Sequence, residues 1–133
     1  MSNKFAPHLQ VLPEDDANRQ FMNGVALNAK LRPRQLQVLP PAGGCLEVLN
    51  RLSDRATIQG LVNYGQRHLL LLIDFDQKYD TRWATYQDKK ATLPPGVAER
   101  VYLLGCLDEP EDFRNAGELA RLVAQVKPFL YQP

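Results

Sequence analysis

The strongest constraint on the fold of this chain is an unbroken apolar run near its middle. The run, Leu69 to Ile73, reads LLLLI and passes directly into the acidic segment DFD at positions 74–76. A strand that is apolar at every position is buried on both faces, and such strands belong to parallel sheets that helices cover on either side. The run therefore predicts an α/β fold with a strand at residues 68–73 inside its sheet.

The rest of the chain alternates between short strand patterns and helical patterns. Strands are predicted at residues 8–12, 34–39 and 100–106. Helical spacing predicts helices at 16–28 and 79–91, one helix or two broken near Asp54 over 45–64, and a final amphipathic helix from about 113. Four such βα units predict a mainly parallel four-stranded sheet with helices on both faces. The order 2-1-3-4 makes neighbours of the first, third and fourth strands.

Composition limits the class of protein further. The chain has 133 residues, of which 44% are hydrophobic and 23% charged, as expected for one globular domain over residues 1–133. No apolar run approaches the length of about 18 residues that spans a bilayer, and the first residues lack the apolar core of a signal peptide. These features predict a cytoplasmic protein with no membrane partner. Cys45 and Cys106 are too few for a disulfide scaffold and lack the spacing of metal ligands, so buried free thiols are expected.

Acidic residues follow three of the predicted strands at the point where each strand ends. They are Glu14, Asp15 and Asp16 after the first strand, Asp74 and Asp76 after the third, and Asp108, Glu109 and Glu111 after the fourth. Carboxyl ends of parallel strands share one edge of a sheet, where binding sites form. Carboxylates gathered there repel unless a hard cation such as Mg²⁺ neutralises them. Asp16 and Glu109 could instead be only helix caps; for Glu14, Asp74 and Asp76 together we favour a metal site.

Three segments, VLPEDDANRQ, QVLPPAGGCLEVL and LLLIDFDQ, resemble the Toprim domain of topoisomerases, DnaG-type primases and OLD-family nucleases. The resemblance extends over about residues 8–115 and implies a Toprim, Rossmann-like fold. It implies that Glu14 is a general acid/base or metal ligand and that Asp74 and Asp76 bind Mg²⁺ or Mn²⁺. Further acidic ligands are then expected at Asp16, Glu109 and Glu111. The chain departs from the family pattern at Asp15, where glycine is usual, and at Cys45, where many members have lysine.

Phosphate-binding groups are also expected beside the acidic residues. The turn PPAGG precedes a helix, so the backbone N–H groups of Gly43 and Gly44 could cradle a phosphate, or the turn could simply allow tight packing. Lys78 and Arg82 follow the acidic segment and are candidate phosphate ligands, although exposed Lys and Arg are common. The net charge of +1 neither demands nor excludes nucleic acid, so binding would rely on a local patch, a metal ion or a partner chain.

The leading hypothesis for function is a Mg²⁺-dependent enzyme that acts on phosphodiester bonds of DNA or RNA, most simply a nuclease. Two alternatives remain. One is a diverged receiver domain of a signalling protein, although the spacing between Asp16 and Asp74 is wide for that family. The other is a non-catalytic module that keeps the fold and binds a protein partner or a second copy of itself.

Overall fold

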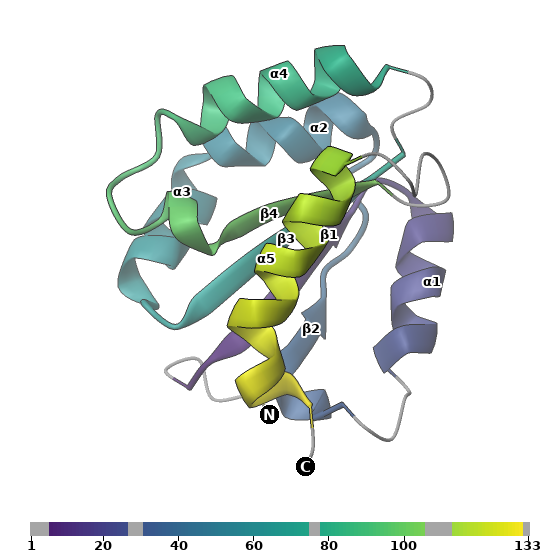
Figure 1. Cartoon of the computed structure of the whole chain (residues 1–133), viewed down its shortest axis with the longest axis vertical. Coiled ribbons are helices and arrows are strands. Elements are labelled where there is room, and N and C mark those ends of the chain that lie inside the picture. The colour runs from purple at the N-terminus through teal and green to yellow at the C-terminus, as the bar shows by residue number, and fades with distance from the viewer. Residues whose placement is uncertain (1–5, 27–30, 75–77, 106–112, 132–133) are drawn as a thin grey trace.

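A four-stranded parallel sheet forms the centre of the computed structural model (Figure 1). The strands are β1 (His8–Pro13), β2 (Leu36–Val38), β3 (Arg67–Ile73) and β4 (Val101–Gly105). Their order is β2-β1-β3-β4, which confirms the predicted parallel sheet and its order. The structure describes residues 6–26, 31–74, 78–105 and 113–131.

β2 is shorter than the sequence predicted. Residues 34 and 35, expected to be strand, instead belong to a 3₁₀ turn, η1 (Pro33–Gln35). The proline fixes its own backbone angle in the helical range and has no N–H to donate to a neighbouring strand, so it favours the turn over an earlier start of pairing. Pairing with β1 then begins where Leu36 faces Leu9.

In the described residues, five α-helices cover the sheet in two layers (Figure 1). They are α1 (Asp16–Ala26), α2 (Cys45–Asn50), α3 (Arg55–Asn63), α4 (Tyr79–Lys90) and α5 (Phe113–Leu130). A 3₁₀ turn, η2 (Arg51–Ser53), lies between α2 and α3, and another, η3 (Ala98–Arg100), lies between α4 and β4. Leu69, Leu71 and Ile73 belong to the core under α2, α3 and α4, whereas Leu70 and Leu72 belong to the core under α1 and α5. The continuous apolar run is therefore buried on both faces, as predicted.

The helical region after β2 divides at Asp54, one of the two arrangements that the sequence allowed. Asp54 has an extended backbone and its carboxylate accepts hydrogen bonds from the Thr57 N–H (3.0 Å) and the Thr57 hydroxyl (2.9 Å). This N-cap satisfies an N–H group that has no partner within the helix, so α3 begins anew after η2.

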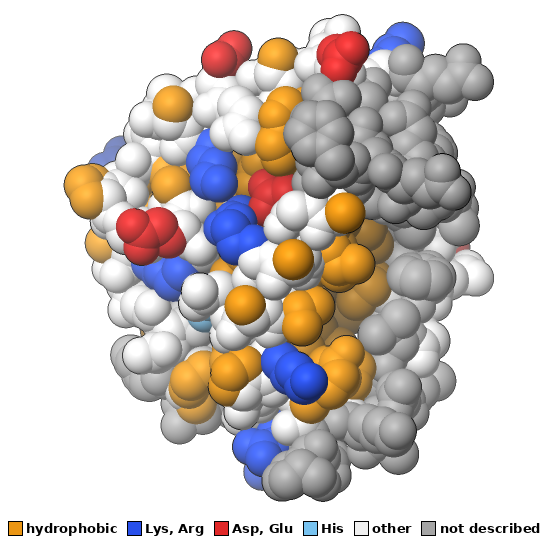
Figure 2. Space-filling view, viewed as in Figure 1, with side chains coloured by type: hydrophobic (Ala, Val, Ile, Leu, Met, Phe, Trp, Pro, Cys, Tyr) orange, Lys and Arg blue, Asp and Glu red, His pale blue; other side chains and the backbone are white. Residues whose placement is uncertain are grey.

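The layer formed by α1 and α5 does not close completely. An apolar groove of about 220 Å³ reaches from these helices down to Leu9 and Leu70 on the sheet. Leu119 and Val123 on α5 border it and remain 49% and 41% exposed, and Figure 2 shows apolar side chains gathered in this hollow. None of the helices in the described part of the chain is long and apolar enough to span a membrane.

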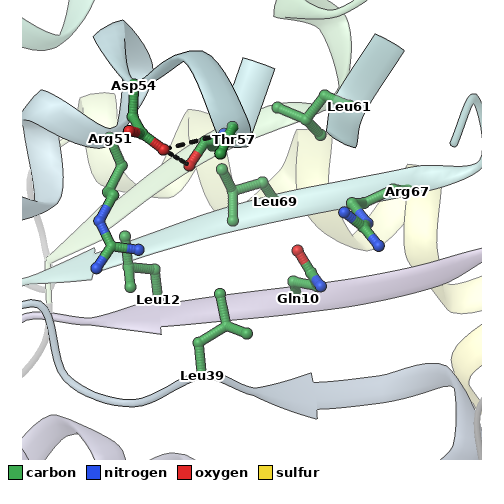
Figure 3. Close-up of a pocket in the computed structure, with 10 residues that line it drawn as sticks. Gln10, Leu12, Leu39, Arg51, Asp54, Thr57, Leu61, Arg67 and Leu69 are labelled. Atoms are coloured by element: carbon green, nitrogen blue, oxygen red, sulfur yellow. Dashed lines mark hydrogen bonds between the residues drawn. The ribbon is translucent and has the colours of Figure 1, made fainter. Parts of the chain in front are cut away.

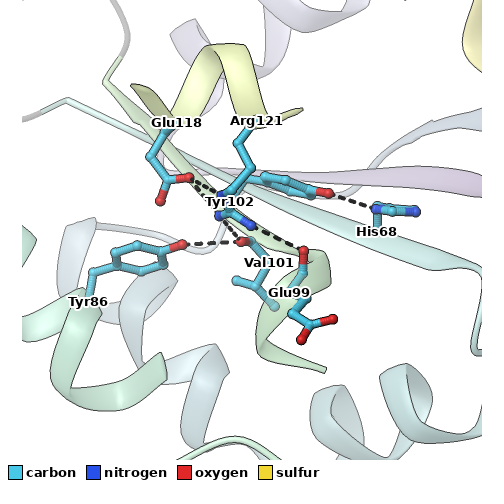
Figure 4. Close-up of polar contacts among 7 residues, drawn as sticks. All are labelled: His68, Tyr86, Glu99, Val101, Tyr102, Glu118 and Arg121. Atoms are coloured by element: carbon cyan, nitrogen blue, oxygen red, sulfur yellow. Dashed lines mark hydrogen bonds and ion pairs between the residues drawn. The ribbon is translucent and has the colours of Figure 1, made fainter. Parts of the chain in front are cut away.

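Side chains from α4 and α5 cover the outer edge of β4 (Figure 4). The Tyr86 hydroxyl donates to the Val101 carbonyl oxygen (3.2 Å), and Arg121 donates to the same oxygen (2.6 Å) and to that of Glu99 (3.1 Å). Arg121 also forms an ion pair of 2.6 Å with Glu118, which is only 5% exposed. These bonds occupy carbonyl groups that an uncovered edge strand would offer to another chain.

Removing the charge of Arg121 should destabilise the fold through Glu118. In Arg121→Met the Glu118 carboxylate loses its cation in a buried position, so we expect a loss of about 2 to 3 kcal/mol in the free energy of unfolding, measured with urea. The double variant Glu118→Leu with Arg121→Met has no buried charge at this place and should recover part of that loss. A double variant less stable than Arg121→Met would contradict this account of the pair.

His68 at the start of β3 is buried and neutral. Its Nδ1 shares a hydrogen bond of 2.9 Å with the Tyr102 hydroxyl, and its ring packs against Tyr102 and Phe129. Burial, with smaller contributions from the charges of Arg100 and His8, lowers the pKa of His68 from 6.5 to about 4. The unfolded chain therefore takes up this proton at a higher pH than the folded protein does.

We expect the protein to lose stability in mild acid for this reason. The contribution of neutral His68 is fully present above about pH 6.5 and is lost as the pH falls toward 4, at a cost of roughly 3 kcal/mol at most. Urea unfolding at about pH 7 and about pH 4.5 measures the change. His68→Phe keeps the ring stack without the titration, so its pH dependence should be shallower. It should not be flat, because burial also lowers the pKa of His8. An equally steep dependence in His68→Phe would show that other groups cause the loss.

Candidate functional site

A cavity opens at the carboxyl ends of β1 and β3, where the sequence predicted a site. Its volume is about 460 Å³. The lining residues come from the end of β1, the turn after β2, the end of β3 and the first turn of α4; they are Glu14, Asp15, Gly43, Gly44, Asp74 and Arg82. The parallel topology thus gathers residues that are up to 68 positions apart in the chain around one open space.

Glu14 is held from three directions. Its N–H donates to the Leu72 carbonyl oxygen (2.9 Å), which continues the pairing of β1 with β3. Its carbonyl oxygen accepts from the N–H groups of Gly43 (3.0 Å) and Gly44 (3.1 Å). Its carboxylate oxygen Oε2 accepts from the Asp74 N–H at 2.9 Å. Backbone and side chain of Glu14 are therefore both fixed at the edge of the cavity.

Arg82 connects α4 to the end of β3. The guanidinium donates through Nη1 to the Asp74 carbonyl oxygen, and the Arg82 N–H donates to the Lys78 carbonyl oxygen (3.0 Å) as the first turn of α4 forms. Because the Asp74 N–H is bound to Glu14, both polar groups of the Asp74 backbone have partners. The backbone at Asp74 is thus fixed between the two side chains.

Cys45 follows Gly44 of the cavity lining and is a buried free thiol at the start of α2. Burial raises the pKa of the Cys45 thiol, and the nearby carboxylates Glu14, Glu47 and Asp74 raise it further while Arg82 opposes them. A thiol in these surroundings stays protonated at neutral pH and is a poor nucleophile. Its place in the site is therefore structural.

The structure brings together five of the predicted site residues, namely Glu14, Gly43, Gly44, Asp74 and Arg82. Two others lie outside the cavity lining. Asp16 is exposed in the first turn of α1, where its carboxylate accepts from the Gln20 side-chain amide (2.7 Å), and Lys78 is exposed before α4. The remaining three, Asp76, Glu109 and Glu111, fall outside the described residues.

Asp15, which the sequence analysis did not select, lines the cavity. Its carboxylate oxygen Oδ1 accepts from the Asn18 N–H (2.9 Å), so Asp15 is the N-cap of α1. A cap residue precedes the helix and stays beside the strand end, whereas the next residue, Asp16, already turns with the helix. The identity of the residue that caps α1 therefore distinguishes the two aspartates. The sequence did not decide between them, because both are aspartates at adjacent positions where a cap could lie.

The two glycine N–H groups in the turn after β2 donate to the protein's own backbone. Both groups donate to the Glu14 carbonyl oxygen, at 3.0 and 3.1 Å, and the phosphate cradle predicted for Gly43 and Gly44 stays a prediction. Gly43 has φ 95° and Gly44 has φ 144°, values that other L-residues rarely adopt. The glycines are needed because this backbone path directs two successive N–H groups at one oxygen.

The cavity offers two predicted metal ligands within the described residues, the carboxylates of Glu14 and Asp74. No group of three or more His, Cys, Asp or Glu side chains that could hold a metal occurs in the part of the chain that the structure describes. Magnesium is commonly bound by only one or two carboxylates together with water, so a pair at the edge of an open cavity fits this ion. A tetrahedral zinc site would need more ligands than this pair provides.

Searches of protein-family models, of curated proteins and of solved structures gave no match to the chain. The Toprim resemblance therefore rests on the three sequence segments, and it stays a prediction.

Replacing Gly43 should strain the turn that holds Glu14. Gly43→Ala forces a side chain onto a backbone with φ 95°, so we expect a loss of about 1 to 3 kcal/mol in the free energy of unfolding. Gly117→Ala is the matched control. Gly117 lies exposed in α5 with nothing within 4 Å of an added Cβ, so alanine should stabilise the helix by up to about 1 kcal/mol. Urea unfolding of both variants checks the opposite signs, and an unchanged stability in Gly43→Ala would refute the strained turn.

Proposed function

We propose that this protein is a Mg²⁺-dependent enzyme acting on phosphodiester bonds of DNA or RNA in the cytoplasm, most simply a nuclease. The observation that carries the proposal is the hydrogen bond from the Asp74 N–H to the Glu14 carboxylate, which joins the acidic ends of β1 and β3 at one cavity. The Toprim resemblance supports the same chemistry, because it selects the same two acidic residues from the sequence alone.

Glu14 and Asp74 would hold Mg²⁺ or Mn²⁺ in this cavity, with Asp76 as a further predicted ligand. A bound divalent ion supplies charge stabilisation to a scissile phosphate and lowers the pKa of a bound water. The protein's own part is to fix the two carboxylates before substrate arrives. Glu14 is fixed through both backbone groups and one carboxylate oxygen, and Asp74 through both backbone groups.

Arg82 supports the proposal as a cation that lines the same cavity as these carboxylates. It donates one guanidinium N–H to the Asp74 carbonyl oxygen. A guanidinium has five N–H groups, so others can bind a phosphate oxygen while this bond persists. Arg82 would then position Asp74 and contact the substrate phosphate at the same time.

Cleavage of labelled single-stranded and double-stranded DNA and RNA with Mg²⁺ or Mn²⁺ tests the function. We expect the pure protein to cleave at least one of these substrates, and we expect Glu14→Gln and Asp74→Asn each to reduce the rate at least about 100-fold, because each removes a carboxylate from the metal. Asp16→Asn is the matched control. Its carboxylate is bound to Gln20 outside the cavity lining, so it should retain the wild-type rate.

The same protein samples separate this proposal from the two alternatives. Cleavage by the Glu14→Gln, Asp74→Asn double variant at the wild-type rate would refute the site. Covalent labelling of Asp74 by acetyl phosphate, without cleavage, would favour a receiver domain. A melting temperature that does not change with Mg²⁺ or Mn²⁺, again without cleavage, would favour a non-catalytic module, since a ligand that binds the folded state must raise it.

A further inference from the structure

A second cavity lies on the face of the sheet that carries α2 and α3, beside β1 and β3 (Figure 3). Its volume is about 280 Å³. Leu12, Leu39 and Leu69 form apolar parts of its surface, and Gln10, Arg51 and Arg67 contribute polar side chains. It shares no lining residue with the candidate site at Glu14 and Asp74.

Arg51 brings to this cavity a guanidinium whose N–H groups are not used within the described residues. The residue is partly buried at the end of α2, and its guanidinium makes no hydrogen bond with another described residue. Among the described lining residues the one carboxylate is that of Asp54, which caps α3 through Thr57; the Thr57 hydrogen bonds and, to a smaller extent, the charge of Arg51 lower the pKa of Asp54. Figure 3 shows the Arg51 side chain directed toward the side of the cavity where Leu12 and Leu39 lie.

Arg67 brings a second guanidinium at the other end of the cavity (Figure 3). Its Nε donates to His8 Nε2 at 3.0 Å, and its guanidinium lies over the Tyr64 ring, 4.6 Å from the ring centre. These contacts hold the group in place but involve no negative charge. The Gln10 side-chain amide lies between the two arginines and donates to Gln37 at 2.9 Å.

The two guanidinium groups and the leucine side chains of the lining together determine the chemical class of ligand that this cavity can bind. The described lining carries two guanidinium groups and one carboxylate, and charge-assisted bonds from arginine favour carboxylate and phosphate oxygens of a ligand. Leucine side chains gain from covering an apolar surface. The volume lies near the lower end of the range for small-molecule sites, about 300 Å³, which suits one small molecule and not a polymer.

We propose that this cavity binds a small organic anion, with its phosphate or carboxylate at Arg51 and an apolar or aromatic body over Leu12, Leu39 and Leu69. Arg67 and Gln10 would then contact the end of the ligand that is opposite Arg51. The site does not depend on the nuclease function. Leu12 of the lining lies on β1 and Glu14 directly follows that strand, so the two residues are separated by roughly 7 Å of extended backbone, the rise of two residues.

Calorimetric titration of the full chain in EDTA tests the proposal with three probes: adenosine 5′-monophosphate, octanoate and inorganic phosphate. We expect at least one of the two organic anions to bind more tightly than inorganic phosphate. Arg51→Gln should weaken that binding about tenfold or more, because it removes a charge-assisted hydrogen bond. Arg51→Lys keeps the charge and should retain part of the affinity. Arg55→Gln, which changes an exposed arginine of α3 outside the lining, should leave the affinity unchanged.

The two organic probes also identify the kind of ligand. Binding of the nucleotide alone indicates a nucleotide site, and binding of octanoate alone indicates a site for aliphatic carboxylates. The proposal is overturned if neither binds below about 5 mM, if inorganic phosphate binds as tightly as they do, or if Arg55→Gln weakens binding as much as Arg51→Gln. Glu14→Gln must leave this binding intact. A loss in that variant would place the ligand in the candidate site instead, whereas absence of nuclease activity would not affect the result.

Discussion

The hydrogen bond between the Asp74 N–H and the Glu14 carboxylate determines how the carboxyl edge of the sheet is built. The pairing of β1 with β3 ends at Pro13 and Leu72, and the Glu14 N–H makes one more bond to the Leu72 carbonyl oxygen. Beyond that point the Glu14 carboxylate, and not a backbone carbonyl, accepts the N–H of Asp74, the residue that directly follows β3. The Glu14 carbonyl oxygen is thereby left for the glycine turn. Glu14 thus binds both the end of β3 and the glycine turn after β2, and its carboxylate lies beside the Asp74 backbone.

The main features of the fold were predictable because they follow from strong local patterns. Five apolar residues in succession, Leu69 to Ile73, require burial on both faces, and only a covered parallel sheet satisfies that requirement in a chain of alternating strands and helices. The bounds of β2 were not predictable in the same way. The segment RQLQVL alternates throughout, and nothing in that alternation shows that Pro33 starts a 3₁₀ turn and delays pairing until Leu36.

For the candidate site, the sequence located the edge of the sheet but not the hydrogen bonds within it. Glu14, Asp74 and Arg82 were selected from their positions after strands, and the structure places all three around one cavity. The choice between Asp15 and Asp16 depended on which residue caps α1, and both are good capping residues by type. The sequence also could not identify the acceptor of the glycine N–H groups. A glycine-rich turn has the same sequence pattern whether its N–H groups donate to a phosphate or to a carbonyl oxygen of the chain itself.

Arginine side chains stabilise the amino ends and the outer edge of the sheet, away from the candidate site. At the amino ends, an arginine side chain binds backbone carbonyl groups. Arg100 donates to the carbonyl oxygens of Leu61 (2.8 Å), Tyr64 (3.2 Å) and Arg67 (2.7 Å). Arg121 does the same along β4, where Glu118 balances its charge. Arg100 and Arg121 bind backbone carbonyl groups, so they stabilise the amino ends and the outer edge of the sheet and form no part of the candidate site. The charged groups that stabilise the sheet and those that line the candidate site are therefore different residues, since neither Arg100 nor Arg121 lines the cavity at Glu14 and Asp74.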